Sequence, residues 1–130
     1  MPSKREVVVT KLSPWSMADT LARLSAVVAA RGMEMFAVID HSGKARDVGL
    51  DLRDTKLVIF GSPSAATPVI AAAPLAALDL PLRVVVWEDG HQTRVSYPAP
   101  AAVARRYGLE GDLADALASI DALISAVIDR

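Results

Sequence analysis

Residues 82–97 read LRVVVWEDGHQTRVSY, and this stretch decides the fold. Its first half is rich in valine, which favours a β-strand. Asp89-Gly90 follows, a pair that is typical of the two central positions of a type I′ hairpin turn, where both residues need positive φ. Residues 92–97 then alternate between apolar and polar side chains, as a strand with one buried face does. The stretch therefore predicts two neighbouring antiparallel strands.

Two amphipathic helices are predicted outside this hairpin. Ser16 and Asp19 have the spacing of a capping box, and an apolar stripe at helical spacing follows them. Gly32 is a natural residue just after a helix end, so the first helix should cover about residues 17–31. The second helix covers residues 112–129, where apolar side chains recur at steps of three and four.

The remaining elements are short. Further strands are predicted over 6–12, 33–40 and 56–60, and short helices over 42–49, 68–73 (with Thr67 as N-cap and Pro68 at N1) and 101–107. Because a run of strands lies between two helices, the order favours an α+β fold over a doubly wound parallel sheet. We expect a β-α-β4-α arrangement with a mostly antiparallel sheet and both long helices packed on one face. Residues 1–130 are predicted to form a single domain.

The composition excludes several classes of function. The chain has 130 residues and a formal net charge of −1, so it has no long-range field that would attract nucleic acid or an anionic membrane. It has no cysteine, which excludes disulfides, thiolate nucleophiles and cysteine-ligated metal sites. Neither a signal peptide nor a run of about 18 apolar residues is found. We therefore expect a soluble cytoplasmic protein without nucleic-acid or membrane partners.

The stretch FGSPSAATP around Gly61 contains residue types that are found in phosphate-binding loops. Such a loop needs successive backbone N–H groups and a lysine. Pro63 and Pro68 remove two of these donors and no lysine follows, so a Walker-type loop is excluded. Two interpretations remain. Gly61, Ser62 and Thr67 either contribute to a site for a polar ligand, or they form a tight turn at Gly61 and a helix cap at Thr67.

His41 follows Asp40 at the end of a predicted strand, a common position for functional side chains. It is either a general base or a ligand of a metal or haem, or else a loop residue that hydrogen-bonds nearby backbone and caps the next helix. The other histidine, His91, lies beside the predicted hairpin turn. A histidine-rich metal site within one chain is therefore not expected, and no metal ligand is assigned.

The hairpin itself carries no catalytic pair. Glu88 and Asp89 are adjacent on a strand, so their carboxylates point to opposite faces and do not form an acid–base pair. Trp87 and Tyr97 are either cross-strand neighbours that line a pocket or simply residues of the core. No serine lies in the sequence context of a nucleophile, so catalytic residues stay unassigned.

The order of these motifs resembles the DUF302 family, domains of uncharacterised function from bacteria and archaea. The matching residues are Ile39-Asp40-His41, Ala45 with Gly49, Phe60-Gly61-Ser62-Pro63, Thr67-Pro68, Ala73-Pro74, Asp79-Leu80-Pro81-Leu82, Trp87-Glu88-Asp89 and Tyr97. The resemblance implies a fold related to the TATA-binding-protein-like α+β group, and it implies no established reaction. The chain departs from the family at Ser62, Ala66, Pro98 and Tyr107, where the family often has Asn, Gly, Asn and His. These departures weaken the expectation that every polar group of a shared site is present.

The features together predict a small ligand-binding or interaction domain. We expect a homodimer, which would cover the open face of the sheet, and a cleft between the His41 turn and the Gly61–Pro68 loop. The residues expected to bind the ligand are His41, Gly61, Ser62 and Thr67. The alternative is an enzyme or redox-linked module that uses a metal, haem or small molecule bound near His41. The cofactor is unassigned in both cases.

Overall fold

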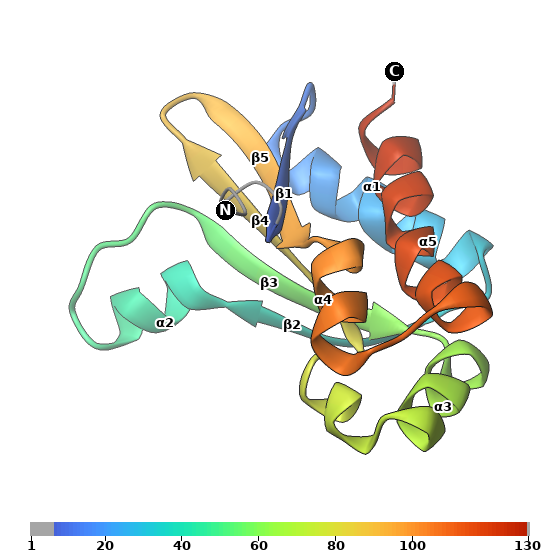
Figure 1. Cartoon of the computed structure of the whole chain (residues 1–130). Helices are drawn as coiled ribbons and strands as arrows, with labels where there is room; N and C mark the ends of the chain where they lie inside the picture. The colour runs from blue at the N-terminus through green and yellow to red at the C-terminus, as the bar shows by residue number, and fades with distance from the viewer. Residues whose placement is uncertain (1–6, 130) are drawn as a thin grey trace.

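The computed structural model describes residues 7–129, and its elements follow the predicted order (Figure 1). The strands are β1 (Val8–Ser13), β2 (Glu34–Asp40), β3 (Thr55–Gly61), β4 (Leu82–Asp89) and β5 (Gln92–Pro98). The helices are α1 (Met17–Ala30), α2 (His41–Asp47), α3 (Pro63–Ala72), α4 (Pro100–Tyr107) and α5 (Gly111–Ile128), with a 3₁₀ helix over Pro74–Leu78. The predicted cap of the first helix is confirmed, because the Ser16 hydroxyl accepts a hydrogen bond from the backbone N–H of Asp19 at 3.0 Å.

The strands form one antiparallel sheet in the order β1-β5-β4-β3-β2. α1 and α5 contact each other and lie to the right of the strands in Figure 1. Their buried stripes, which include Leu24 and Val28 on α1 and Leu123 and Ile124 on α5, meet the inward side chains of the sheet in one core cluster. The predicted α+β fold with both long helices on one face is confirmed.

The hairpin turn lies one residue later than the sequence predicted. Asp89 pairs with Gln92, so the two turn residues are Gly90 and His91. Gly90 has a φ of 64°, whereas no residue other than glycine within 7–129 has a positive φ. A single glycine with positive φ at the first central position fits a type II′ turn and excludes type I′. Asp89 thus belongs to the strand, and its carboxylate pairs with Arg94 at 3.1 Å.

The helix after Gly61 also begins earlier than predicted. Ser62 is its N-cap residue, Pro63 occupies the first helical position, and Thr67 and Pro68 lie inside the helix. Both prolines suit the first position of a helix, and the small residues between them allow the helix to start at the earlier one. Pro68 has no N–H to donate to the carbonyl of Ser64, but Ser64 is exposed, so water can bond to that carbonyl instead. The predicted cap at Thr67 was wrong.

The face of the sheet opposite α1 and α5 is partly open to solvent and carries apolar side chains together with the polar ones of Thr10, Arg83, Arg94 and Ser96. Its side chains alternate with the core residues along each strand, and the apolar members are Val8, Leu12, Ala37, Ile39, Leu57, Ile59, Val85 and Trp87. We call this set the outer face. Val8 and Leu12 are 45% and 51% exposed.

Tyr97 lies in the core, as one of the two interpretations expected, whereas Trp87 lies on the outer face, so the two side chains are not cross-strand neighbours. The register pairs Trp87 with Arg94, which is an odd number of residues from Tyr97 and therefore on the opposite side. The indole N–H of Trp87 donates to the hydroxyl of Ser96 at 3.0 Å instead.

Candidate functional site

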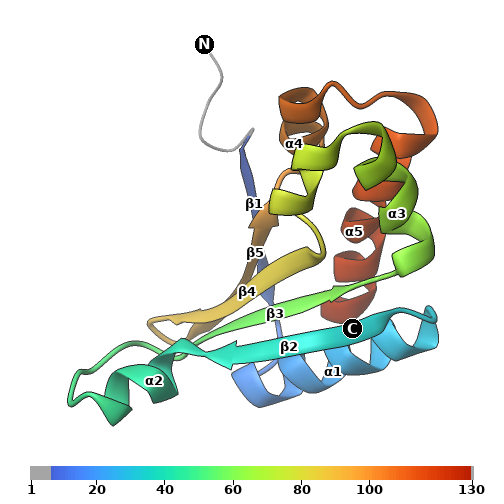
Figure 2. The same cartoon turned by 90° about the horizontal axis from the view of Figure 1, so that it is seen from below.

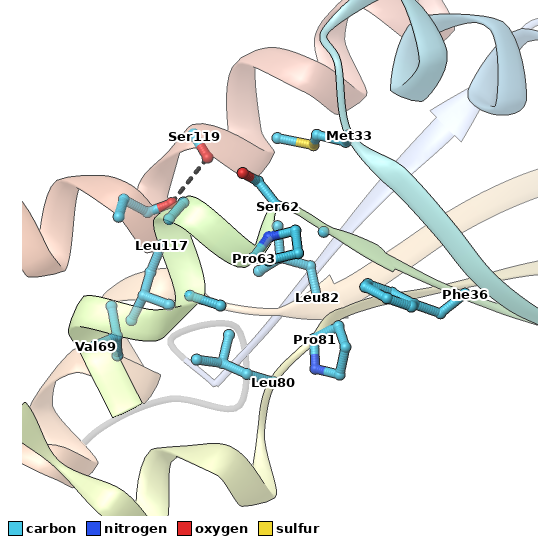
Figure 3. Close-up of a pocket in the computed structure, with 14 residues that line it drawn as sticks. Met33, Phe36, Ser62, Pro63, Val69, Leu80, Pro81, Leu82, Leu117 and Ser119 are labelled. Atoms are coloured by element: carbon cyan, nitrogen blue, oxygen red, sulfur yellow. Dashed lines mark hydrogen bonds between the residues drawn. The ribbon is translucent and has the colours of Figure 1, made fainter. Parts of the chain in front are cut away.

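The candidate site is a pocket where β3 ends and α3 begins. Glu34 of β2 pairs with Gly61, and Phe60 pairs with Leu82 at the start of β4. The chain leaves the sheet at Gly61, enters α3 after Ser62 and returns to the sheet at Leu82. α5 contacts α3 and closes the far side of the pocket (Figure 3). We call this cavity the Ser62 pocket.

A β-bulge in β2 brings an aromatic ring to the Ser62 pocket. The register shifts between Met35 and Ala37, so Phe36 has no partner residue on β3. Bulges of this kind change the direction of a side chain and often lie beside binding sites. The ring of Phe36 lies next to Gly61 and Pro81 (Figure 3). Since Phe36 is 43% exposed, it forms part of the mouth of the pocket and not of the core.

Gly61 leaves space in this pocket and does not form a tight turn. It ends β3 in extended conformation, and it is not among the glycines with positive φ. A Cβ atom at Gly61 would lie 3.5 Å from the Cβ of Pro81 and 3.9 Å from Cε2 of Phe36, which is ordinary contact. The backbone therefore does not require glycine here. The missing side chain instead widens the pocket between Pro81 and Phe36.

The chemistry of the Ser62 pocket is apolar. The cavity has a volume of about 70 Å³, and no titratable side chain lines it. Its polar side chains are Ser62 and Ser119, and its apolar wall includes Met33, Phe36, Val69, Leu80, Leu82 and Leu117. The Ser62 hydroxyl hydrogen-bonds the Ser64 hydroxyl at 2.9 Å, so it does not cap α3. This arrangement can hold an apolar group and offer it a hydroxyl at the rim, but it has no group for acid–base catalysis.

The structure does not form the predicted cleft between the His41 turn and the Gly61–Pro68 loop. Asp40 pairs with Lys56 at one end of the β2–β3 ladder, and Glu34 pairs with Gly61 at the other end. A strand rises about 3.3 Å per residue, so these ends are roughly 20 Å apart. Figure 2 shows α2 at one end of these strands and α3 at the other. The two loops seemed close only because both follow strand ends in the sequence.

His41 is the exposed first residue of α2. The cap of this helix is Asp40, whose Oδ1 accepts hydrogen bonds from the backbone N–H of Gly43 at 2.9 Å and from the hydroxyl of Ser42 at 2.7 Å. These bonds, the one from Gly43 first, hold the pKa of Asp40 below its ordinary value. The side chain of His41 forms no hydrogen bond or ion pair with the part of the chain that the structure describes, so the predicted capping role belongs to its neighbour.

Two of the four residues predicted to bind a ligand lie together. Gly61 and Ser62 both line the Ser62 pocket. Thr67 is exposed on α3 and does not line it, and His41 lies at the far end of the sheet. Among residues 7–129, no three His, Cys, Asp or Glu side chains gather where they could hold a metal ion.

A smaller, more polar cavity of about 20 Å³ adjoins the Ser62 pocket. It shares the side chains of Leu82 and Leu117 with that pocket, and it is also lined by Asp79 and Arg83. We call it the Arg83 pocket. Its size is enough for about one water molecule.

Asp79 of the Arg83 pocket is already paired. Its Oδ2 accepts hydrogen bonds from the hydroxyl of Tyr107 and from Nη1 of Arg106, the latter at 2.8 Å. The hydrogen bond from Tyr107 is the main reason why the pKa of Asp79 is lowered, and the same bond raises the pKa of Tyr107. Tyr107 is one of the positions at which the chain departs from the family pattern, and the structure places it beside a residue of the family motif.

The fold and the pocket define a small α+β domain with an apolar cavity at one end of its sheet. Residues 9–127 match the family described as "Domain of unknown function DUF302", so the chain belongs to the DUF302 family. The crystal structure of an uncharacterised conserved DUF302 protein from Bacillus stearothermophilus has the same fold. It superposes with a TM-score of 0.81 over 95% of this chain and 96% of that chain, at 21% identity. The relation to the TATA-binding-protein-like group stays a prediction.

Two curated relatives are longer proteins. The "Fluoride-specific ion channel FluC 1" of Brucella suis biovar 1 (strain 1330) is 37% identical over 110 residues, which cover 82% of this chain and 43% of the relative. The "Fluoride-specific ion channel FluC 2" of Brucella melitensis biotype 1 is also 37% identical over 110 residues, which cover 41% of its length. This chain therefore spans less than half the length of these relatives. Within residues 7–129, no helix has the length and apolar character that crossing a membrane requires.

Several residues of the Ser62 pocket could not be recognised from the sequence. Phe36 sits in a run that reads as a regular strand, and its bulge depends on the pairing of β2 with β3. Leu117 and Ser119 belong to α5, far away in the sequence, and Leu117 is one of the buried residues of that helix. One signal was available. Leu80-Pro81-Leu82 is part of the family motif, and all three residues line the pocket.

Proposed function

We propose that this chain is a ligand-binding domain that holds a small apolar group in the Ser62 pocket. The observation that supports the proposal is the lining itself, because a preformed apolar cavity with a few hydroxyls at its rim is the usual form of a small-molecule site. Gly61 and Ser62 are the predicted ligand residues that this proposal keeps. The partly exposed ring of Phe36 lies at the mouth of the pocket, where a ligand would enter.

The volume limits the ligand. The cavity has a volume of about 70 Å³, which is less than half of the roughly 150 Å³ of an engineered cavity that binds benzene. The ligand group can therefore be no larger than one ring or a short alkyl chain, and the walls must move outward to admit it. Unpaired charges are excluded from its interior, because a charge that loses water without a partner is strongly destabilised. A ligand therefore has an apolar end, with any polar group at the rim.

Nuclear magnetic resonance tests this proposal directly. Titration of the ¹⁵N-labelled protein with benzene or 1-hexanol should shift the backbone amide signals of Gly61, Ser62 and Leu82. Ala66 lines the pocket, and the Ala66→Leu variant adds a side chain large enough to fill the cavity. We expect the apparent Kd for either probe to rise at least about tenfold in this variant.

Two matched variants serve as controls. Thr67→Val changes the next residue of the same helix, which is exposed and outside the pocket, and should leave the probe affinity unchanged. His41→Ala tests the alternative of an enzyme or redox-linked module near α2 and should also leave it unchanged. Loss of binding in His41→Ala, or equal binding in Ala66→Leu and the wild type, would contradict the proposal.

The proposal also includes a homodimer formed through the outer face. Five strands about 4.8 Å apart and about five residues long present roughly 400–500 Å² per copy, so a face-to-face dimer buries near 1,000 Å² in total. That area is about the lower limit for a specific interface, and the apolar side chains of the face gain from being covered. One domain over residues 1–130 and a cytoplasmic location remain parts of the same proposal.

The dimer predicts a sharp effect of Val85→Lys. Val85 is on β4, the central strand of the sheet, so two-fold pairing brings two added lysines close together. Light scattering after size exclusion should give twice the 13.7 kDa chain mass for the wild type and the single chain mass for Val85→Lys. Val48→Lys is the control, because Val48 is 71% exposed on the surface after α2. A wild-type protein that is monomeric at micromolar concentration would contradict the dimer.

A further inference from the structure

We propose that the Ser62 pocket and the Arg83 pocket are the two ends of one binding site, and that its ligand is a small carboxylic acid with an apolar chain. This inference rests on the proposed function of the Ser62 pocket and adds the chemical class of the ligand. The apolar chain occupies the Ser62 pocket, and the carboxylate points toward Arg83.

The first support is that the two cavities are contiguous. Leu82 and Leu117 line both of them, so the apolar end and the polar end adjoin at these two side chains. Leucine side chains change rotamer without breaking any hydrogen bond, and a ligand that displaces them gains apolar contact on both sides. An elongated molecule can therefore extend from one cavity into the other, whereas a single ring fills only the first.

The second support is the state of Arg83. Its Nε is buried and has no hydrogen-bond partner, and its Nη2 donates only to the carbonyl of Leu78 at 3.3 Å. No carboxylate within residues 7–129 forms an ion pair with Arg83. A buried donor without a partner is costly, and native proteins rarely keep one without a reason. A ligand carboxylate would supply the missing acceptor in the two-point geometry that guanidinium groups favour.

The third support is the charge balance. The carboxylate of Asp79 lines the same cavity, but it already accepts hydrogen bonds from Arg106 and Tyr107. Asp79 interacts with the charges of both Arg106 and Arg83, so one carboxylate faces two guanidinium groups and a positive charge remains in excess. This balance favours an anionic head group over an alcohol and disfavours an amine.

The experiment compares three probes of equal chain length: hexanoate, 1-hexanol and hexylammonium. We expect hexanoate to bind about tenfold more tightly than 1-hexanol near neutral pH, since a hydrogen-bonded charge pair that is partly shielded from water contributes this much. Hexylammonium should bind more weakly than either. Hexanoate should shift the amide signals of Ser62, Asp79 and Val103. Benzene should shift the signal of Ser62 but not those of Asp79 and Val103.

Arg83→Met locates the effect. It should remove the preference for hexanoate and leave the Kd of 1-hexanol within about twofold of the wild type. Arg105→Met makes the same charge change at an exposed residue of α4 and should keep the preference. An unchanged amide spectrum away from residue 83 shows that each variant is folded, and Arg83→Lys gives a second variant that keeps the charge if the methionine variant does not fold.

The possible outcomes separate this inference from the proposed function. Equal affinity for hexanoate and 1-hexanol, or a preference that survives Arg83→Met, overturns the carboxylate inference and leaves the Ser62 pocket as a site for apolar groups. Absence of any shift at Gly61 and Ser62 with every probe overturns both.

Discussion

Phe60→Ala should lower the free energy of unfolding by about 3–5 kcal/mol, the range measured for truncation of buried aromatic side chains. Phe60 is fully buried on β3 and belongs to the core cluster that joins the sheet to α1 and α5. Its loss leaves a cavity under two helices that are each held by other contacts, α1 by β2 and β4 and α5 by α3 and α4, so they do not simply move inward to fill it. Denaturation with urea, followed by circular dichroism, measures the change.

The second phenylalanine of the chain provides the control. Phe36 is 43% exposed at the mouth of the Ser62 pocket, so Phe36→Ala should cost no more than about 1 kcal/mol. The two variants also separate an effect on ligand binding from an effect on stability. Phe36→Ala changes the Ser62 pocket but leaves the core filled, whereas Phe60→Ala creates a cavity in the core. Similar costs for both variants would mean that the ring of Phe36 is buried in solution or that the core tolerates the loss of Phe60.

The second large effect is expected at Tyr97, which is 2% exposed on β5. Its hydroxyl donates a hydrogen bond to Asp121 and thereby connects the sheet to α5. Tyr97→Ala should cost about 3–5 kcal/mol, because it removes a buried ring. Tyr97→Phe keeps the ring and should cost only about 1 kcal/mol, because Asp121 is exposed and can bond to water when the hydroxyl is gone.

Tyr97 also predicts a pH dependence. Burial, and then the hydrogen bond to Asp121, raise the pKa of Tyr97 above the ordinary value of 10.0. The folded protein therefore keeps this proton to a higher pH than the unfolded chain does. The stability from Tyr97 is fully present below pH 10 and is lost as the pH rises from there toward the folded-state pKa.

Urea denaturation at neutral pH and at increasing pH above about 10 measures this loss. In Tyr97→Phe the loss should be smaller. Some loss will remain, because Tyr107 also has a raised pKa and contributes in the same direction. Wild-type and Tyr97→Phe curves with the same alkaline slope would contradict a buried, protonated Tyr97.

Much of the fold follows from local patterns. The capping box at Ser16 and the stripe of α5 define helices because their residues contact one another, or neighbours one turn away. The hairpin of β4 and β5 was recognised from the Asp89-Gly90 pair between a valine-rich run and an alternating run, although the turn lies one residue later than expected. These features depend on residues close in sequence, and such features are the most predictable.

The candidate site was only partly predictable. Gly61 and Ser62 were singled out from the sequence as a family-matching loop at a strand end, and both line the Ser62 pocket. The predicted cleft between Gly61, Ser62 and His41 does not form, because β2 and β3 run antiparallel. An antiparallel pair places the end of one strand beside the start of the next, so two loops that both follow strand ends are kept apart.

The sequence by itself determined the order of strands and helices, the antiparallel hairpin and the faces of the long helices, since these follow from spacing and from turn residues. Tertiary structure alone decided the register of β2 on β3, which creates the bulge that turns Phe36 toward Gly61. It also decided which part of α5 closes the pocket and which side of the sheet stays open. The physical reason is that register and helix placement depend on how much apolar area the whole chain buries. That area depends on contacts between residues far apart in the sequence, so a local pattern cannot predict it.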